Sequence, residues 1–354
     1  MRLAAISQGL ALLVLGLSAQ SLWADTAVKI ALPDPLSQQA LQALGNGEGN
    51  VLLSPQSLVD VVALSRAGLG ETPPTALMPS TVVSANAAWF DTTAVPTAEA
   101  SKTLTTDWDA PPVSLDMAKD GKTKINEWVR EATEGRIQDL ITDPLVGVSV
   151  VLTNALVFKD AWRVPFDPDE TIPRDFHLTG DETVEVPFML SPVAALCQDS
   201  EQGVLVALSF AEAGHLVLRP QAEEAAMTCT GELEASDEGA DDNRLVQVAM
   251  PRIDLTADLD LSGLVKTLGL SAAMAEGFAY LTVAPSVPGP VLQSVLFRAD
   301  EEGAEAAAAT AAIGVRSVRV PESPLLVFDR PFEFFVMMPG HDTAMIAGIL
   351  RDPR

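Results

Sequence analysis

The residue types that most often carry out catalysis are sparse in this sequence. Its three histidines stand far apart, at His177, His215 and His341. None lies in an HExxH or Cys-His context, and the chain has no GxSxG nucleophile motif, no phosphate-binding P-loop and no glycine-rich dinucleotide motif. The sequence therefore predicts no catalytic residue, no metal site and no cofactor, and each histidine is interpreted as structural or exposed.

The N-terminus has the features of a secretory signal peptide. A short basic start, Met1 and Arg2, is followed by the apolar residues 9–17 and by small residues around Ala24. The apolar stretch is too short for a membrane span of about 20 residues. We predict a signal peptide over residues 1–24 and an exported mature chain, residues 25–354, that works in the periplasm or outside the cell.

Two cysteines, Cys197 and Cys229, remain in the mature chain. An exported protein reaches an oxidising compartment, in which such a pair can form a disulfide. Two separate buried thiols are the alternative, because spacing in the sequence does not show whether the two residues meet in the fold.

Composition indicates one large folded domain with an acidic surface. The 354 residues are 48% hydrophobic and 20% charged, which is enough apolar material for a sizeable core. Forty-eight acids against 22 basic residues give a net charge of −26, which repels phosphate backbones and anionic lipids. Nucleic acid and membrane surfaces are therefore not expected as partners. The acidic residues 223–242 lack the spacing of a calcium-binding loop and are interpreted as a solvated connection.

Hydrophobic periodicity predicts an α+β fold in which helices come first and strands later. Residues 55–68 have apolar side chains at helical spacing, and residues 125–141 are typical of two helices joined by a turn at Gly135. The apolar residues 148–158 predict a buried strand. Three C-terminal segments predict further strands, namely 245–255, 323–338 and 344–350. The first two are expected to be broken by the prolines near their middles, Pro251 and Pro331. No repeat or flexible linker divides the chain.

One long segment, residues 303–328, lies between two predicted strands, although connections beyond about 12 to 15 residues are uncommon and usually functional. A short exposed helix is one interpretation, because the segment is rich in alanine. If it forms a strand instead, its small, uncharged alternate residues share one face: Ala304, Ala306, Ala308 and Thr310. Such a strand can enter a sheet above a packed core, with Gly303 as a hinge and Glu305 facing solvent.

The segment DEEGAEAAAAT, residues 300–310, resembles the hinge motif of the serpin family. FDRPFEFFVMM (328–338) and AMIAGILRDP (344–353) resemble the two closing strands of that family. NVLLSPQSL (50–58) resembles the start of its second helix, and the blocks between resemble its central helices and strands, at 125–141, 152–178 and 186–189. In this order the motifs identify nearly the whole mature chain as similar to a serpin, and we expect an exported member of prokaryotic type.

The resemblance implies a single α+β domain with three β-sheets, about eight or nine helices and an exposed reactive loop, here about residues 301–324. Inhibitory members are suicide substrates of serine proteases, and sometimes of cysteine proteases. The protease cleaves the loop and is trapped as an acyl-enzyme when the loop inserts into the central sheet. The implied protein is a monomeric protease inhibitor rather than an enzyme.

The position of the cleaved bond stays open between neighbouring residues. In the family the scissile carbonyl usually belongs to the fifteenth residue, counted with the hinge glycine as the first. Here that residue is Ser317, which would make Ser317-Val318 the cleaved bond. One residue earlier gives Arg316-Ser317, which suits a trypsin-like protease. Arg319-Val320 is a third option, and we predict Arg316-Ser317. The hinge implied by the resemblance comprises Glu301, Glu302, Gly303, Ala304, Glu305, Ala306, Ala307, Ala308, Ala309 and Thr310.

The resemblance also assigns structural roles in sheet opening. Ser54, Ser57 and Asn154 match residues beneath the central sheet, and Trp162 matches the tryptophan near the point of loop entry. Gln293 stands where many members have a histidine.

The chain departs from the family pattern between Gly70 and Trp89, which is too short for the helices usually found there. One of these binds heparin-like polyanions in activated members, so polyanion binding is not expected. A non-inhibitory serpin that binds or carries a ligand is the main alternative function. An exported enzyme with an unrecognised site is a third hypothesis.

Overall fold

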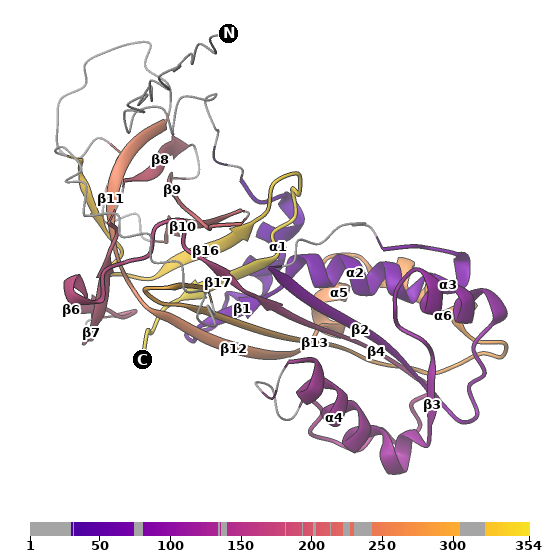
Figure 1. Cartoon of the computed structure of the whole chain (residues 1–354). Coiled ribbons are helices and arrows are strands. Elements are labelled where there is room, and N and C mark those ends of the chain that lie inside the picture. The colour runs from indigo at the N-terminus through magenta and orange to yellow at the C-terminus, as the bar shows by residue number, and fades with distance from the viewer. Residues whose placement is uncertain are drawn as a thin grey trace, which may run out of the picture.

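The computed structural model describes residues 30, 32–73, 81–133, 135, 140–180, 182–192, 194–200, 203–212, 214–221, 227–229, 243–304 and 323–354. Within these ranges the chain forms two large β-sheets and a set of short helices (Figure 1). None of the helices found there has the length and apolar character needed to cross a membrane.

The first sheet has seven strands in the order β3-β2-β4-β13-β14-β5, with β12 beside β13. Its long central strands, β4 and β13, are parallel neighbours, while β2 and β12 run antiparallel to them on either side. Every residue of β4 is buried, which agrees with the continuous apolar run in its sequence. The bounds are β2 (Val82–Asp91), β3 (Val113–Leu115), β4 (Val150–Phe158), β5 (Asp160–Ala161), β12 (Ile253–Asp260), β13 (Pro288–Ala299) and β14 (Gly303–Ala304).

The second sheet has ten strands in the order β1-β17-β16-β10-β9-β8-β11-β7-β6, with β15 beside β11. The expected second and third sheets are joined here, because β11 pairs with β8 through its first residues and with β7 through its last ones. The strands are β1 (Val51–Leu53), β6 (Ile172–His177), β7 (Thr183–Leu190), β8 (Ala195–Ser200), β9 (Gly203–Ser209), β10 (His215–Pro220), β11 (Asn243–Pro251), β15 (Leu325–Val327), β16 (Phe332–Met337) and β17 (Ile346–Leu350).

Helix α2 packs against one face of the seven-stranded sheet and α4 against the other face (Figure 1). α2 begins where the Ser54 hydroxyl accepts a hydrogen bond from the Ser57 amide, with Pro55 as its first residue. It ends at Ser65, earlier than predicted, and a 3₁₀ turn, Ala67–Leu69, continues to Gly70, whose φ of 79° favours glycine.

The helix predicted from residue 125 starts earlier, because Asp116 caps a preceding turn, Met117–Gly121, that runs directly into it. The turn at Gly135 is present, and most of the second short helix predicted after it lies outside the described residues. Six α-helices occur in the described part of the chain, where eight or nine were expected. They are α1 (Pro35–Leu44), α2 (Pro55–Ser65), α3 (Ala98–Thr106), α4 (Lys122–Ala132), α5 (Ser262–Thr267) and α6 (Ser271–Leu281).

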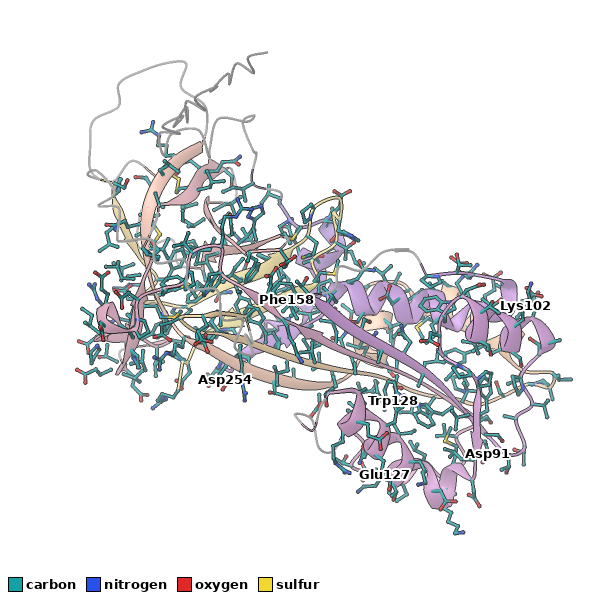
Figure 2. The ribbon with its side chains drawn as sticks, in the orientation of Figure 1. Asp91, Lys102, Glu127, Trp128, Phe158 and Asp254 are labelled. Atoms are coloured by element: carbon teal, nitrogen blue, oxygen red, sulfur yellow. A yellow bond between two sulfur atoms is a disulfide. The ribbon has the colours of Figure 1, made fainter. Side chains whose placement is uncertain are left out.

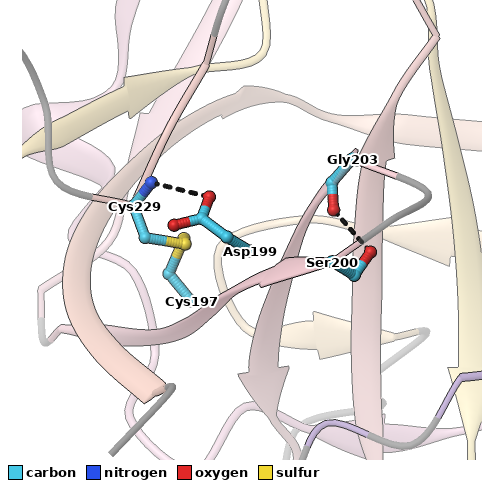
Figure 3. The surroundings of a disulfide bond; sticks show 5 residues. All are labelled: Cys197, Asp199, Ser200, Gly203 and Cys229. Carbon is cyan, nitrogen blue, oxygen red and sulfur yellow. Dashed lines mark hydrogen bonds between the residues drawn. A yellow bond between two sulfur atoms is a disulfide. The ribbon is translucent and has the colours of Figure 1, made fainter. Parts of the chain in front are cut away.

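A disulfide joins Cys197 on β8 to Cys229, which lies in the connection between β10 and β11 (Figure 3). Both cysteines are completely buried, and the Cys229 amide donates to a carboxylate oxygen of Asp199 at 3.3 Å. Of the two alternatives left open by the sequence, the structure therefore has the disulfide. It fastens the acidic connection, most of which lies outside the described residues, to β8.

Removing this disulfide should destabilise the protein. The two cysteines are 32 residues apart, and closing a loop of that length contributes about 3–4 kcal/mol in the chain-entropy model. We expect the Cys197→Ala/Cys229→Ala double variant to lose about that much in its free energy of unfolding, measured by urea denaturation. A loss that equals the one seen when the wild type is reduced would assign the effect to the bond, whereas no loss in either case would contradict the prediction.

Candidate functional site

A tight turn between β13 and β14 forms the described part of the hinge. The Asp300 carboxylate accepts hydrogen bonds from the amides of Glu302 and Gly303, at 2.9 and 3.3 Å. The chain then enters the seven-stranded sheet as β14, where Ala304 lies opposite both Ala299 of β13 and Asp160 of β5. The first two residues of the small-residue segment are therefore already a strand between two others.

Gly303 is required by a close approach of two backbones. Its φ is 153°, a conformation that side chains disfavour, and a Cβ atom there would lie 2.4 Å from the Asp160 carbonyl oxygen and 2.5 Å from the Ala161 Cα. No larger residue fits without moving β14 away from β5. The glycine thus fixes the place at which the segment enters the sheet.

A buried carboxylate anchors the hinge to the second sheet. Glu301 is only 6% exposed and accepts hydrogen bonds from Arg252, the shortest at 2.6 Å, and from the Thr171 hydroxyl at 2.7 Å. Burial acts to raise the pKa of Glu301, but the bonds from Arg252 and Thr171 outweigh it and hold that pKa below its ordinary value. The carboxylate therefore stays charged and bound to both partners at neutral pH.

Trp162 holds the other side of the turn. Its indole nitrogen donates to the Asp300 carbonyl oxygen at 2.6 Å, and its backbone amide donates to the Glu302 carbonyl oxygen at 3.0 Å. The ring stacks on Phe210 with centroids 4.8 Å apart and meets Phe166 edge to face at 5.5 Å. This aromatic cluster packs beneath the point where β14 enters.

Below the hinge, β4 and β13 are directly hydrogen-bonded neighbours, with no strand between them. Their parallel pairing runs without interruption from Val291↔Leu152 to Leu296↔Val157, so that each residue of β13 has a partner on β4 in this stretch. β14 is in phase with both strands, because the same alignment that places Ala304 opposite Ala299 and Asp160 leads down the line between them. A longer β14 would continue into the position where β4 and β13 now meet.

A buried polar cluster lies under this line, at the start of α2. On β13, the side-chain nitrogen Nε2 of Gln293 donates to the Ser54 backbone carbonyl oxygen at 2.8 Å, and its Oε1 accepts from the Ser54 backbone amide at 2.9 Å. Asn154 on β4 donates to Ser84 and Asn86, at 3.2 and 3.0 Å. The side-chain oxygen Oδ1 of Asn154 and the Ser57 hydroxyl are buried and have no hydrogen-bond partner among the described residues.

A family model described as serpin (serine protease inhibitor) matches residues 74–353. The chain belongs to the serpin family. Among curated proteins, alpha-1-antiproteinase S of Cavia porcellus is 28% identical to it over 69% of this chain, and alpha-1-antitrypsin 1-2 of Mus musculus is 28% identical over 68%. The matching regions cover 62% and 60% of those relatives, so the chain spans about three fifths of their length.

Solved serpin structures share the fold. Serpin48 of the insect Tenebrio molitor superposes with a TM-score of 0.73 at 22% identity, covering 89% of this chain and 96% of its own. The thermophilic serpin tengpin gives 0.74 at 15% identity, covering 90% and 92%. Thyroxine-binding globulin in complex with thyroxine gives 0.71 at 19% identity, covering 90% and 96%. At these identities the likeness concerns the fold alone.

The residues that the sequence assigned to this serpin's site divide into two groups. Ser54, Ser57, Asn154 and Gln293 form the polar cluster, and Trp162 lies at the hinge with Glu301, Glu302, Gly303 and Ala304. The remaining hinge residues, 305–310, and the reactive-bond residues Arg316, Ser317, Val318, Arg319 and Val320 lie outside the described residues. Sequence reasoning missed Arg252, Thr171 and Phe210, because nothing in their local sequence links them to the hinge.

One charged group beneath the serpin sheet is expected to make stability depend on pH. Asp60 on α2 is 5% exposed, and burial raises its pKa to about 6 although a hydrogen bond from Gln56 acts in the opposite direction. The folded chain keeps a proton there that the unfolded chain loses above about pH 4, so stability falls as the pH rises from about 4 to 6 and stays reduced above.

Asp60→Asn should therefore stabilise the protein at neutral pH. We expect a gain of up to about 3 kcal/mol at pH 7.5, because the neutral amide avoids burying a charge. At pH 4 the variant and the wild type should be equally stable, since Asp60 is then protonated. Urea unfolding at the two pH values measures this, and a difference that does not change with pH would show that the effect is not one of charge.

Proposed function

We propose that this serpin is a suicide-substrate inhibitor of serine proteases with trypsin-like specificity. The observation that carries the proposal is β14, which is already seated between β13 and β5 and points down the line where β4 and β13 meet. After cleavage of the reactive loop, residues beyond Ala304 extend β14 along that line and separate the two parallel strands.

The register of β14 says where each hinge residue would go. Extended in phase, Ala306 comes to lie between Phe158 and Phe297, and Ala308 between Leu156 and Val295. All four neighbours are buried in the core between the sheets, where Ala304 also lies. Only small, uncharged side chains fit there without displacing core atoms or burying a charge.

Thr310 reaches the polar cluster in the same register. Its neighbours are Asn154 and Gln293, whose side chains are fully buried. A threonine hydroxyl can donate a hydrogen bond to the side-chain oxygen Oδ1 of Asn154, which has no partner in the described residues. Insertion would thus satisfy a polar atom that the uncleaved sheet leaves unpaired, which favours the inserted state.

Glu305 occupies the opposite face and meets two basic residues. In the extended register it lies between Lys159, which follows β4, and Arg298 on β13, whose side chain is 48% exposed. The one carboxylate in the inserting stretch therefore arrives where two positive charges flank it. This arrangement supports the proposed register and depth of insertion.

The trapping step uses ordinary acyl-enzyme chemistry. The serine hydroxyl of the protease attacks the carbonyl carbon of Arg316, the Arg316-Ser317 bond breaks, and the new amino group of Ser317 leaves with the C-terminal fragment. Residues 303–316, extended at about 3.3 Å each, span about 46 Å, enough to carry the bound protease along the sheet before water reaches the ester.

Strand insertion can supply the free energy for this movement. About ten additional ladder hydrogen bonds, at about 0.5–1.5 kcal/mol each, amount to some 5–15 kcal/mol. That is comparable to the stability of a whole domain.

The wider setting of the protein belongs to the same proposal. A signal peptide over residues 1–24 exports a single serpin domain, residues 25–354, to the periplasm or the medium. We propose a monomer of prokaryotic type, although the curated relatives compared above are mammalian. The net charge of −26 supports a partner that is a protease, with cysteine proteases as a second class, rather than nucleic acid, membrane or a heparin-like polyanion.

The direct test is to mix the protein with trypsin and run a denaturing gel after boiling, with mass spectrometry of the released peptide. A boiling-resistant complex, together with a peptide that begins at Ser317, is the expected result. A complex whose peptide begins at Val318 or Val320 would move the reactive bond. Cleavage without a complex, and without a gain in heat stability, would overturn inhibition by insertion.

One observation favours the alternative of a non-inhibitory serpin that binds a ligand. A partly open cavity of about 250 Å³ lies on the ten-stranded sheet. Its lining is mostly apolar, from residues such as Ile30, Val217 and Met337, with the imidazoles of His215 and His341 at its side. Cleavage by trypsin without complex formation would leave this alternative as the stronger one.

A further inference from the structure

β3 forms one free edge of the seven-stranded sheet. It pairs in parallel with β2, from Trp89↔Val113 to Asp91↔Leu115, and no other strand of the described residues pairs with its outer side. Val113 is 38% exposed and Ser114 is also exposed. An open edge strand presents unpaired amide and carbonyl groups to any chain that can lie alongside it.

A groove of about 500 Å³ runs between this edge and helix α4. β3 forms one wall, and the other is the face of α4 that carries Lys124, Glu127, Trp128 and Glu131, at the spacing of one helical face. Trp128 meets Trp89 of β2 edge to face, with centroids 5.9 Å apart. Figure 2 shows Trp128 between α4 and the sheet. We call this space the β3–α4 groove.

The β3–α4 groove has an excess of negative charge. Three carboxylates line it, from Asp120, Glu127 and Glu131, against the single ammonium of Lys124. Lys124 is paired with Glu127 at 2.7 Å. The hydrogen bond and charge of Glu127, with the charges of Asp120 and Glu131, raise the pKa of Lys124 above its ordinary value. The groove therefore suits a cationic occupant.

We propose that the β3–α4 groove binds an extended, basic peptide segment of a partner protein, which adds to β3 as an outer strand. The main chain of the peptide pairs with β3, and alternate arginine or lysine side chains reach the carboxylates of α4 and the ring of Trp128. A second copy of this chain is disfavoured as the occupant, because its net charge is −26. This site is separate from the hinge and does not depend on the proposed inhibition.

The test measures fluorescence anisotropy of a labelled nine-residue peptide that alternates arginine and valine, titrated with the full-length protein. A matched peptide that alternates glutamate and valine should not bind. An analogue of the basic peptide with methylated backbone nitrogens has the same charges but cannot form a strand ladder, and it should bind at least tenfold more weakly. Equal binding of the methylated analogue would overturn strand addition, and no binding of the basic peptide would overturn the site.

A pair of variants locates the binding. Glu127→Gln/Glu131→Gln removes two groove charges and should weaken binding of the basic peptide about tenfold. The control, Glu99→Gln/Glu276→Gln, removes two similarly exposed helical carboxylates on α3 and α6 and should leave it unchanged. Hydrogen exchange should slow at residues 113–115 when the peptide is bound. Equal weakening by both double variants, or unchanged exchange at β3, would place the peptide elsewhere on the acidic surface.

Discussion

If this serpin inhibits trypsin-like proteases as proposed, Thr310→Arg should turn it from an inhibitor into a substrate. In the proposed inserted register, residue 310 would lie between Asn154 and Gln293, both of which are fully buried. Burying an unpaired guanidinium there costs several kcal/mol, and even about 3 kcal/mol would slow insertion more than a hundredfold. Water then reaches the acyl-enzyme first, so the protease is released and the loop is cleaved without a lasting complex.

The control for this prediction is Thr310→Val, which keeps the shape of the side chain and adds no charge. It should still form the boiling-resistant complex, because it lacks only the hydroxyl that can bond to Asn154. Complex formation is quantified on denaturing gels at increasing ratios of inhibitor to protease. Retention of full inhibition by the arginine variant would show that residue 310 does not enter the core face, and that the register is wrong.

Glu301→Lys should detach the hinge from its anchor and destabilise the uncleaved protein. The substitution places an ammonium beside Arg252 and removes the acceptor of the Thr171 hydroxyl. Loss of the charged hydrogen bonds to a nearly buried carboxylate costs about 2–3 kcal/mol. We expect the free energy of unfolding, measured by urea denaturation, to fall by that amount. We also expect a lower ratio of trapped to released protease, because β14 starts from a displaced position.

The ion pair of Arg298 with Asp254 provides the matched control, since it also joins neighbouring strands but lies in solvent. Its side chains are 48% and 65% exposed, and Asp254 is visible at the surface in Figure 2. Asp254→Lys should change the free energy of unfolding by less than about 1 kcal/mol, as is usual for exposed pairs. If the two substitutions cost the same, the burial of Glu301 would not be the reason for its effect.

Local patterns in the sequence were sufficient for several single elements. The apolar run predicted for residues 148–158 is β4, within two residues at its start. The predicted break at Pro251 is the end of β11, after which β12 begins at Ile253. These predictions succeeded because the period of apolar residues and the positions of prolines act over a few neighbouring residues.

Long-range partners could not be predicted in the same way. Glu301 and Arg252 are far apart in the chain, and only the pairing of β12 with β13 brings them together. The stacking of Trp162 on Phe210 likewise depends on β5 and the end of β9 meeting at the hinge. The expected second and third sheets are joined because β11 is long enough to pair with β8 through its first residues and with β7 through its last ones.

If the protein traps proteases as proposed, the position of Gly303 and Ala304 in the sheet also affects the rate of trapping. Formation of a new strand is ordinarily limited by its nucleation, since the first contacts fix many dihedrals for little gain in bonding. In the structure Ala304 is already paired with both β13 and β5, and Gly303 is paired with β5. Insertion then needs no nucleation step and proceeds by extension of an existing strand. The number of inhibitor molecules consumed for each protease inactivated should therefore depend on how fast β4 and β13 separate, and not on how fast the cleaved loop finds its place in the sheet.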